Sequence, residues 1–308
     1  MGTAELACAS LSALREGTGF EVVAVVTQPD RPKGRALKLQ PSPVKETALA
    51  AGLPVLQPER ARDAAFVEAL RQLQPHFIVV AAYGQLLPTA ILTLPTLGCV
   101  NVHTSLLPKY RGAAPIQWAI LNGEAETGVT IMNMVEKLDA GDILSRRATE
   151  ITPEDTAETL HDRLAQMGAQ LLVATLHKIV MGILTPHPQV EAEATYARKI
   201  TKEDGRLDWS QPARILWNRV RAFTPWPGAF THPAAETKLR TLKILRASLV
   251  EDLGGAPGSM IKADKSGIVV ACGRGALRIE ELQLEGGRRM TAAQFLAGHF
   301  LKPGECLG

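Results

Sequence analysis

Cysteine is scarce in this chain of 308 residues, and its few copies are scattered. Cys8, Cys99, Cys272 and Cys306 include no C-x-x-C pair, so the sequence predicts neither a disulfide framework nor a cysteine-bound zinc site. We expect free thiols, no bound metal and a protein that works in the reducing cytoplasm.

Long apolar runs are also lacking. No run reaches the roughly 18 residues that a membrane span needs, and no basic-then-apolar start resembles a signal peptide. A G-x-G-x-x-G turn after a strand is missing too, which disfavours a nicotinamide-dependent dehydrogenase. Hydrophobic residues still make up 46% of the chain, enough for ordinary cores. We therefore expect a globular protein with no membrane partner. We also expect it to act as a monomer.

Negative charge is low in the last third of the chain. The net charge is only +3, but residues 1–205 carry 19 basic and 22 acidic side chains, whereas residues 206–308 carry 15 and 9. The last third is therefore net +6 and the rest net −3. This asymmetry is a modest indication of a polyanionic partner such as nucleic acid.

Strand and helix patterns alternate through the first half of the chain. Strand patterns cover residues 21–27, 53–56, 76–82, 99–103 and 128–134. Helical patterns cover residues 4–14, 44–51, 64–73, 118–121 and 156–181. This alternation predicts a doubly wound α/β domain with a mostly parallel sheet over residues 1–182. Such a sheet normally opens with a strand, yet the chain begins Met1-Gly2-Thr3-Ala4. The first strand is apparently missing, and we expect it to be encoded upstream.

The pattern changes in the carboxyl-terminal part. Residues 183–204 are irregular and polar and predict a linker. Short strand patterns separated by hairpin turns then follow over residues 242–249, 258–263, 267–272 and 277–284. We expect a small all-β domain over residues 205–308.

Polar residues that suit acyl transfer occur on the strand Cys99-Val100-Asn101-Val102-His103. Side chains alternate across a strand, so Asn101 and His103 lie on the same face. An amide and an imidazole side by side can both donate hydrogen bonds to a developing oxyanion. Leu107-Pro108 stops the strand, which places the pair near a carboxyl end, where open α/β sheets keep their sites.

Asp139 completes a possible constellation. It follows a second strand pattern, on the turn-forming stretch Leu138-Asp139-Ala140-Gly141-Asp142, and a carboxylate beside an imidazole favours the charged ring. The three residues predict an acyl-transfer site without a nucleophilic side chain. An isolated N-x-H is nevertheless more typical of a structural core histidine, so these residues alone leave both interpretations open.

The longer run containing these residues resembles a known family. Asn101–Gly112 reads N-V-H-T-S-L-L-P-K-Y-R-G, and Ala114-Pro115-Ile116 and the Asp139 stretch follow in order. This resembles the 10-formyltetrahydrofolate-dependent formyltransferases, whose signature is a strand Asn-x-His, a Ser-Leu-Leu-Pro loop and a later Asp. The resemblance implies catalysis by Asn101, His103 and Asp139, 10-formyltetrahydrofolate as formyl donor, no metal, and a carboxyl-terminal OB-like barrel.

The resemblance also assigns two stretches to the folate pocket. The first follows the strand at residues 76–82 and comprises Tyr83, Gly84, Gln85, Leu86 and Leu87. The second comprises Ser105, Leu106, Leu107 and Pro108. From the residues alone, the first stretch is equally well an ordinary strand-to-helix loop.

The amine that accepts the formyl group is indicated by the loop at residues 28–45, which holds five basic residues and one acidic residue. Taken alone, such a loop is most often a solvated charge run. Family members that act on methionyl-initiator tRNA carry this loop and a motif like R-A-F-T-P-W-P-G at residues 221–228. The resemblance therefore implies tRNA contacts by Arg31, Lys33, Arg35 and Lys38, and a tRNA-binding role for residues 205–308. Two alternatives are a formyltransferase for a small amine such as an amino sugar nucleotide, and a non-catalytic RNA-binding relative.

Overall fold

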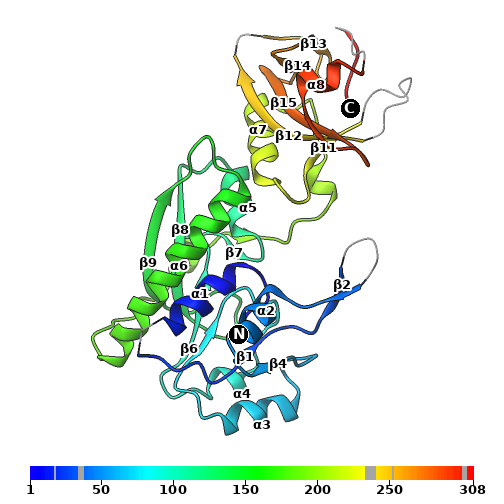
Figure 1. The fold of residues 1–308 in the computed structure, drawn as a ribbon. Coiled ribbons are helices and arrows are strands. Elements are labelled where there is room, and N and C mark those ends of the chain that lie inside the picture. Colours follow the sequence, from blue (N-terminus) through cyan, green and yellow to red (C-terminus); the bar gives the residue numbers. More distant parts are fainter. Residues whose placement is uncertain (17–18, 34–37, 233–240, 252, 300–303) are drawn as a thin grey trace. The chain divides into compact units, whose positions relative to one another are not determined.

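The computed structural model describes residues 1–16, 19–33, 38–232, 241–251, 253–299 and 304–308, and it divides into two compact units (Figure 1). The first unit comprises Met1–Pro115, Glu126–Glu150 and His161–Ala197, and the second comprises Ile116–Ala125, Ile151–Leu160 and Arg198–Gly308. The boundary after Ala197 lies inside the linker expected over residues 183–204. Residues 183–197 therefore belong to the first unit. No helix in the described ranges is long and apolar enough to cross a membrane.

The first unit contains most of the helices and strands that the sequence predicts. Its strands are β1 (Val25–Val26), β2 (Arg31–Lys33), β3 (Lys38–Gln40), β4 (Val55–Leu56), β5 (Ile78–Val80), β6 (Cys99–His103), β7 (Arg111–Gly112), β8 (Glu126–Asn133), β9 (Ile143–Glu150) and β10 (Tyr196–Ala197). Its helices are α1 (Leu6–Arg15), α2 (Pro43–Ala50), α3 (Ala64–Gln72), α4 (Thr89–Leu92) and most of α6 (Ala157–Val180), with a 3-10 turn η1 (Glu191–Glu193).

The sheet of the first unit is parallel on one side of β6 and antiparallel on the other. Its strand order is β5-β6-β8-β9, with β5 parallel to β6 and with β6–β8 and β8–β9 antiparallel. The predicted α/β class is confirmed, and the pairings β1–β4, Gly2–Ala81 and β5–β6 are parallel. The antiparallel part of this sheet is confined to β8 and β9, which form a hairpin through the turn that carries Asp139.

The start of the chain lies between this sheet and the parallel pair β1–β4. Gly2 forms a parallel bridge with Ala81 and donates its N–H to the carbonyl of Val26 at 2.9 Å. Met1–Thr3 therefore occupies the position of a strand between β1 and β5.

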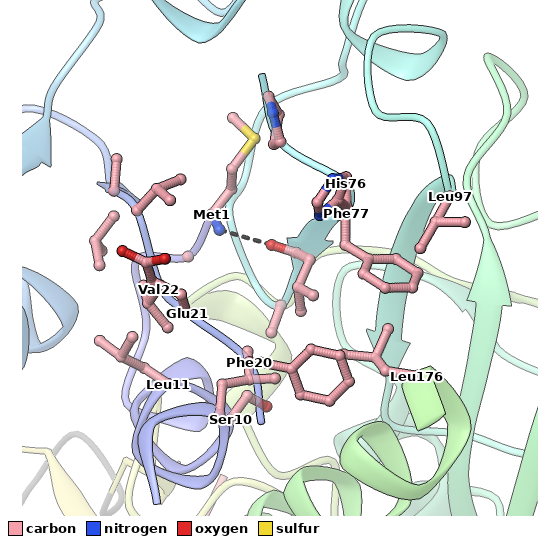
Figure 2. Close-up of a pocket in the computed structure, with 18 of the residues that line it drawn as sticks. Met1, Ser10, Leu11, Phe20, Glu21, Val22, His76, Phe77, Leu97 and Leu176 are labelled. Atoms are coloured by element: carbon pink, nitrogen blue, oxygen red, sulfur yellow. Dashed lines mark hydrogen bonds between the residues drawn. The ribbon is translucent and has the colours of Figure 1, made fainter. Parts of the chain in front are cut away.

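A cavity of about 760 Å³ lies beside Met1 (Figure 2). Its lining is largely apolar and includes Leu11, Phe20 and Phe77. The amino group of Met1 is buried here and donates to the carbonyl of Val79 at 2.6 Å. Burial lowers the pKa of this amino group to about 6, because desolvation disfavours its charged form.

Local chemistry explains how the helices of the first unit begin and pack. The Ser42 side chain caps α2 by accepting the N–H of Lys45 at 3.0 Å, and Pro43 follows at the first helical position. On α6, a Cβ at Gly168 would lie 2.9 Å from a methyl of Val102 and 3.3 Å from one of Val129. The glycine thus lets α6 pack closely against β6, which carries Asn101 and His103, and against the neighbouring strand β8.

The second unit is mainly an antiparallel sheet, and helices α7 (Ala213–Ala222) and α8 (Ala292–Leu296) contribute buried residues to its core. Its strands are β11 (Ala229–Thr231), β12 (Leu242–Val250), β13 (Met260–Asp264), β14 (Gly267–Ala271), β15 (Ala276–Leu284) and β16 (Arg289–Thr291). Its helices are α5 (Pro115–Leu121), whose first residue belongs to the first unit, α7 (Ala213–Ala222), α8 (Ala292–Leu296) and the 3-10 turn η2 (Glu203–Gly205). Leu216 of α7 and Ile244 of β12 are buried in one core cluster.

The order of this second sheet is β11-β12-β15-β14-β13, with β16 also paired to β15. The four strands expected between residues 242 and 284 are confirmed within two residues at each end. An OB-like barrel was expected, but among the described residues no pairing between β11 and β13 closes the sheet. The described part is thus an open antiparallel sheet.

Candidate active site

Strand β6 carries Asn101 and His103 to the carboxyl end of the sheet, as its alternation predicts. Asn101 pairs in register with Val80 of β5 and Met132 of β8, and His103, the last residue of the strand, pairs with Thr130. His103 is only 6% exposed. No hydrogen bond between described residues uses the carboxamide of Asn101, so this side chain remains available to a ligand.

Both ring nitrogens of His103 face acceptors. Nε2 lies 2.9 Å from the carbonyl oxygen of Tyr110, and Nδ1 lies 3.7 Å from Oδ2 of Asp139. A carbonyl oxygen cannot donate, so Nε2 must carry the hydrogen of that bond. The ring orientation is therefore fixed by the backbone of Tyr110, and Nδ1 is the nitrogen left for chemistry.

Asp139 is held on the turn between β8 and β9. Its φ is +48°, a left-handed conformation that few residues other than glycine adopt. Its Oδ2 accepts the backbone N–H of Gly112 at 2.8 Å while facing His103. The structure thus brings together the three residues, separated by up to 38 positions, that the sequence singled out.

A cavity of about 490 Å³ opens beside these residues. Asn101, His103 and Asp139 all line it, and so does the whole stretch Tyr83–Leu87. Its volume falls in the range of small-molecule sites, about 300–1,000 Å³. The cavity lies entirely within the first unit.

The Tyr83–Leu87 stretch is anchored and presents one unused donor. The carbonyl of Tyr83 accepts from Gln28 Nε2 at 2.8 Å and from Thr3 Oγ1 at 3.0 Å, and Gln85 Oε1 accepts the N–H of Ala61 at 2.8 Å. The Tyr83 hydroxyl is buried and has no partner among the described residues. Burial also raises the pKa of this hydroxyl, so it stays protonated.

The second expected wall, Ser105–Pro108, is not part of the lining; Thr104 is the nearest residue that is. Ser105 Oγ donates to the carbonyl of Lys109 at 2.6 Å, and Thr130 Oγ1 donates to the Ser105 carbonyl at 2.7 Å. Leu107 is fully buried in a cluster with Met132. These contacts fix the turn that leads to Tyr110, whose carbonyl orients His103.

No thiol near the site is suited to act as a nucleophile. Cys99 begins the same strand, but burial raises the pKa of its thiol to about 12. No cluster of three or more metal-ligating side chains occurs in the described segments. The arrangement offers hydrogen-bond donors and a carboxylate beside a cavity, which suits stabilisation of an oxyanion and transfer of a proton.

The basic loop forms a short hairpin. β2 and β3 pair in antiparallel register, with Arg31 opposite Gln40 and Lys33 opposite Lys38, and Arg31 is exposed. Arg35 lies outside the described residues. The fifth basic residue, Lys45, lies on the adjacent helix α2, and its Nζ is 2.7 Å from Oδ2 of Asp30.

The sequence predicted no role for three residues that support this geometry, namely Tyr110, Gly112 and Gln189. The carbonyl of Tyr110 and the N–H of Gly112 are backbone groups, for which side-chain identity gives no signal. Gln189 bonds to the backbone of the Asp139 turn from 50 positions away, inside the expected linker. Tyr110 and Gly112 lie within the recognised run, and their place in it was the one available indication.

Comparison with known proteins gives a consistent family. The model of the formyl transferase family matches residues 1–176, and that of the formyl transferase carboxyl-terminal domain matches residues 199–300. The chain is 50% identical over 308 residues to the methionyl-tRNA formyltransferase of Geobacter metallireducens, covering all of this chain and 97% of that one. It is also 50% identical over 308 residues to the methionyl-tRNA formyltransferase of Caldanaerobacter subterraneus, covering 98% of it.

Solved structures agree on the fold. WlaRD, a sugar 3N-formyl transferase, has a TM-score of 0.65 at 18% identity, covering 94% of this chain and 96% of that chain. HypX from Aquifex aeolicus, solved with tetrahydrofolic acid, has a TM-score of 0.59 at 22% identity, covering 82% of this chain and 44% of that one. At such identities the likeness shows a shared fold.

Proposed function

This chain belongs to the formyl transferase family, and we propose that it transfers a formyl group from 10-formyltetrahydrofolate to the α-amine of methionyl-initiator tRNA. The product is N-formylmethionyl-tRNA for the initiation of translation. The observation that carries the chemistry is the placement of Asn101, His103 and Asp139 on one cavity wall. The choice of acceptor is supported by full-length relatives at about 50% identity that are named for methionyl-tRNA.

The formyl donor fits the cavity beside these residues. Tyr83–Leu87 supply an anchored wall of this cavity. The donor brings an activated formyl group attached to its N10 atom. Ser105–Pro108 act in this proposal by shaping the turn that supports His103, and only indirectly as part of the folate site.

Asn101 and His103 stabilise the charge that develops when the amine attacks. A bond forms between the amine nitrogen and the formyl carbon, and negative charge gathers on the formyl oxygen. The Asn101 amide and the Nδ1–H of the protonated His103 ring donate to that oxygen, and one such donor typically contributes about 10²–10³ in rate. Nε2 cannot take this role because it is bonded to Tyr110.

Asp139 keeps His103 oriented and handles the proton. An α-amine has a pKa near 7.7–8.0 in simple peptides, so part of it is already uncharged near neutral pH. The attacking amine must still lose one proton as the carbon–N10 bond breaks. We assign Asp139 to pass that proton, through water, toward N10 as the oxyanion collapses.

Contacts with tRNA come from two basic regions in this proposal. Arg31, Lys33 and Lys38 belong to strands β2 and β3 of the first unit, and Arg35 follows Lys33 in the sequence. The second unit, whose residues 206–308 are net +6, adds a further polyanion-binding surface. We propose that the protein works as a monomer in the cytoplasm, where charged tRNA is present. A small amine acceptor would need neither basic region.

The decisive experiment is an assay of formyl transfer with two acceptors. Methionyl-tRNA and an amino sugar nucleotide would each be incubated with the enzyme and 10-formyltetrahydrofolate. We expect transfer to methionyl-tRNA alone. Transfer to the sugar nucleotide alone would contradict the acceptor, and binding of tRNA without any transfer would favour a non-catalytic RNA-binding protein.

A further inference from the structure

The segment from His187 to Ala197 lies against both sides of the predicted site. His187 and Ile143 exchange backbone hydrogen bonds of 2.8 and 2.9 Å, next to the Asp139 turn. Tyr196 and Ala197 of β10 pair with Arg111 and Gly112 of β7. Gln189 is half-buried between these two attachments.

The carboxamide of Gln189 is used on both of its ends. Its Nε2 donates to the carbonyl oxygens of Asp139 at 2.8 Å and Gly141 at 2.7 Å. Its Oε1 accepts from Arg111, from Nε at 3.1 Å and from Nη2 at 2.9 Å. An amide has two N–H donors and an oxygen with two lone pairs, so every polar position is satisfied. A carboxylate could not donate to the two carbonyls, and an ammonium could not accept from the arginine.

Arg111 holds the oxygen end of the Gln189 carboxamide in place. Its side chain is fully buried, and its remaining polar partner is Oε2 of Glu191 at 2.9 Å. A buried guanidinium is costly without acceptors, so Arg111 holds Gln189 firmly. The next residue, Gly112, donates directly to the carboxylate of Asp139. Strand β7 therefore controls the Asp139 carboxylate through Gly112 and the Asp139 backbone through Gln189.

We propose that Gln189 is a positioning residue for the formyl transfer, holding the Asp139 turn so that its carboxylate faces Nδ1 of His103. The turn needs such support because Asp139 adopts a left-handed φ of +48°. The contact between Asp139 and His103 is already long, at 3.7 Å. A small shift of the turn would separate the two groups. This role rests on the proposed function, since His103 is the residue through which Gln189 acts.

The test compares Gln189→Glu and Gln189→Met with the matched control Gln170→Glu. Gln170 also accepts from an arginine, Arg147, at 3.2 Å, but it is exposed. We expect both Gln189 variants to lower kcat by about 10- to 100-fold, as misplacement of a reacting group does, while KM for each substrate changes less than about threefold. Gln170→Glu should match the wild type.

A second measurement separates positioning from general stability. In the ¹⁵N NMR spectrum of the ligand-free protein, the Nδ1 signal of His103, assigned with a His103→Asn variant, should shift in both Gln189 variants and not in Gln170→Glu. Unchanged kcat, or reduced kcat with an unmoved His103 signal, would overturn the proposal. If Gln189→Glu does not fold, the near-isosteric and neutral Gln189→Met decides the question. If the wild type transfers no formyl group, the function fails while the NMR comparison still tests the placement.

Discussion

At the scale of single residues, His103 lies between two acceptors, one from a backbone carbonyl and one from a carboxylate. We expect Asn101→Ala, His103→Ala and Asp139→Ala each to lower kcat by at least about 10²-fold, because each removes support from one oxyanion. Thermal unfolding should show that the variants remain folded. The double and triple variants should lose far less than the product of the single losses. Near-normal turnover by His103→Ala would refute the mechanism.

Two features of Gly112 favour glycine: its φ is positive, and the backbone of Ala197 lies close to it. Its φ is +118°, and a Cβ there would lie 2.7 Å from the carbonyl oxygen of Ala197. We expect Gly112→Ala to displace the N–H that holds Asp139 and to lower kcat by on the order of 10²-fold. Gly98→Ala is the control, since Gly98 has a φ of +109° with open space around it. Gly98→Ala should cost about 1–2 kcal/mol of backbone strain yet keep its activity. Equal losses of activity in both variants would contradict this role.

Which site residues the sequence could predict depends on how each one acts. The side chains of Asn101 and His103 lie on one face of a strand, so period-two alternation was enough to place them together. Asp139 was added because its turn-forming stretch follows a second strand pattern, and the family run then supported that assignment. The carbonyl of Tyr110 and the distant amide of Gln189 left no pattern in the sequence. Their contacts exist only once the chain has folded.

At the scale of elements, strands and helices with regular patterns were predicted well. Strand β6 matches its predicted bounds, and α6 lies within one residue of them at each end. Strand β9 and helix α7 were missed. β9 alternates weakly and carries charged residues such as Arg146 and Arg147, and α7 carries three arginines and a Trp along a short helix. Tertiary packing against β8 and β12 determines these two elements more than local pattern does.

The short strand at Met1 predicts a dependence of stability on pH. In the fold the pKa of the Met1 amino group is lowered to about 6, against about 8 in the unfolded chain. Between these values the unfolded chain binds the proton and the folded chain does not, so stability should rise as pH increases from about 6 to 8. The gain is about 2–3 kcal/mol, since one pKa unit is worth about 1.4 kcal/mol.

Urea unfolding of the chain with a free amino group at Met1, measured across that pH range, checks this prediction. The same chain acetylated at Met1 is the control, because acetylation removes the titrating charge and leaves every histidine unchanged. The acetylated chain should lack this part of the slope. Identical slopes for the two proteins would show that the Met1 amino group does not carry the effect.

At the scale of the whole molecule, charge counts indicate a polyanionic partner, but they give no sign of where one unit ends and the next begins. The positive last third and the basic loop were both visible as charge counts. The boundary at Ala197 was not, because residues 183–197 are irregular and polar although they bond to the first unit. A polar, irregular stretch is a linker only when its backbone forms no hydrogen bonds with the units that it joins.

Recognition of tRNA through the β2–β3 loop predicts a salt dependence. Each phosphate neutralised on a duplex stem contributes about −0.9 to the slope of log affinity against log salt. We therefore expect Arg31→Ala and Arg35→Ala each to weaken methionyl-tRNA binding and to make that slope less steep by about one. Affinity for 10-formyltetrahydrofolate should stay unchanged, because Arg31 does not line the cavity beside His103 and Arg35 is expected to contact tRNA alone.

The measurement is methionyl-tRNA affinity across a salt series, with folate affinity determined separately for each variant. Arg71→Ala is the matched control, since Arg71 is an exposed arginine of the same unit that pairs with Glu68 on α3. Its slope should equal that of the wild type. If Arg31→Ala and Arg35→Ala also keep the wild-type slope, the loop is a solvated run of charges and tRNA must be held elsewhere. If folate affinity falls together with tRNA affinity, the substitutions disturb the structure of the first unit as a whole and do not act through tRNA contacts.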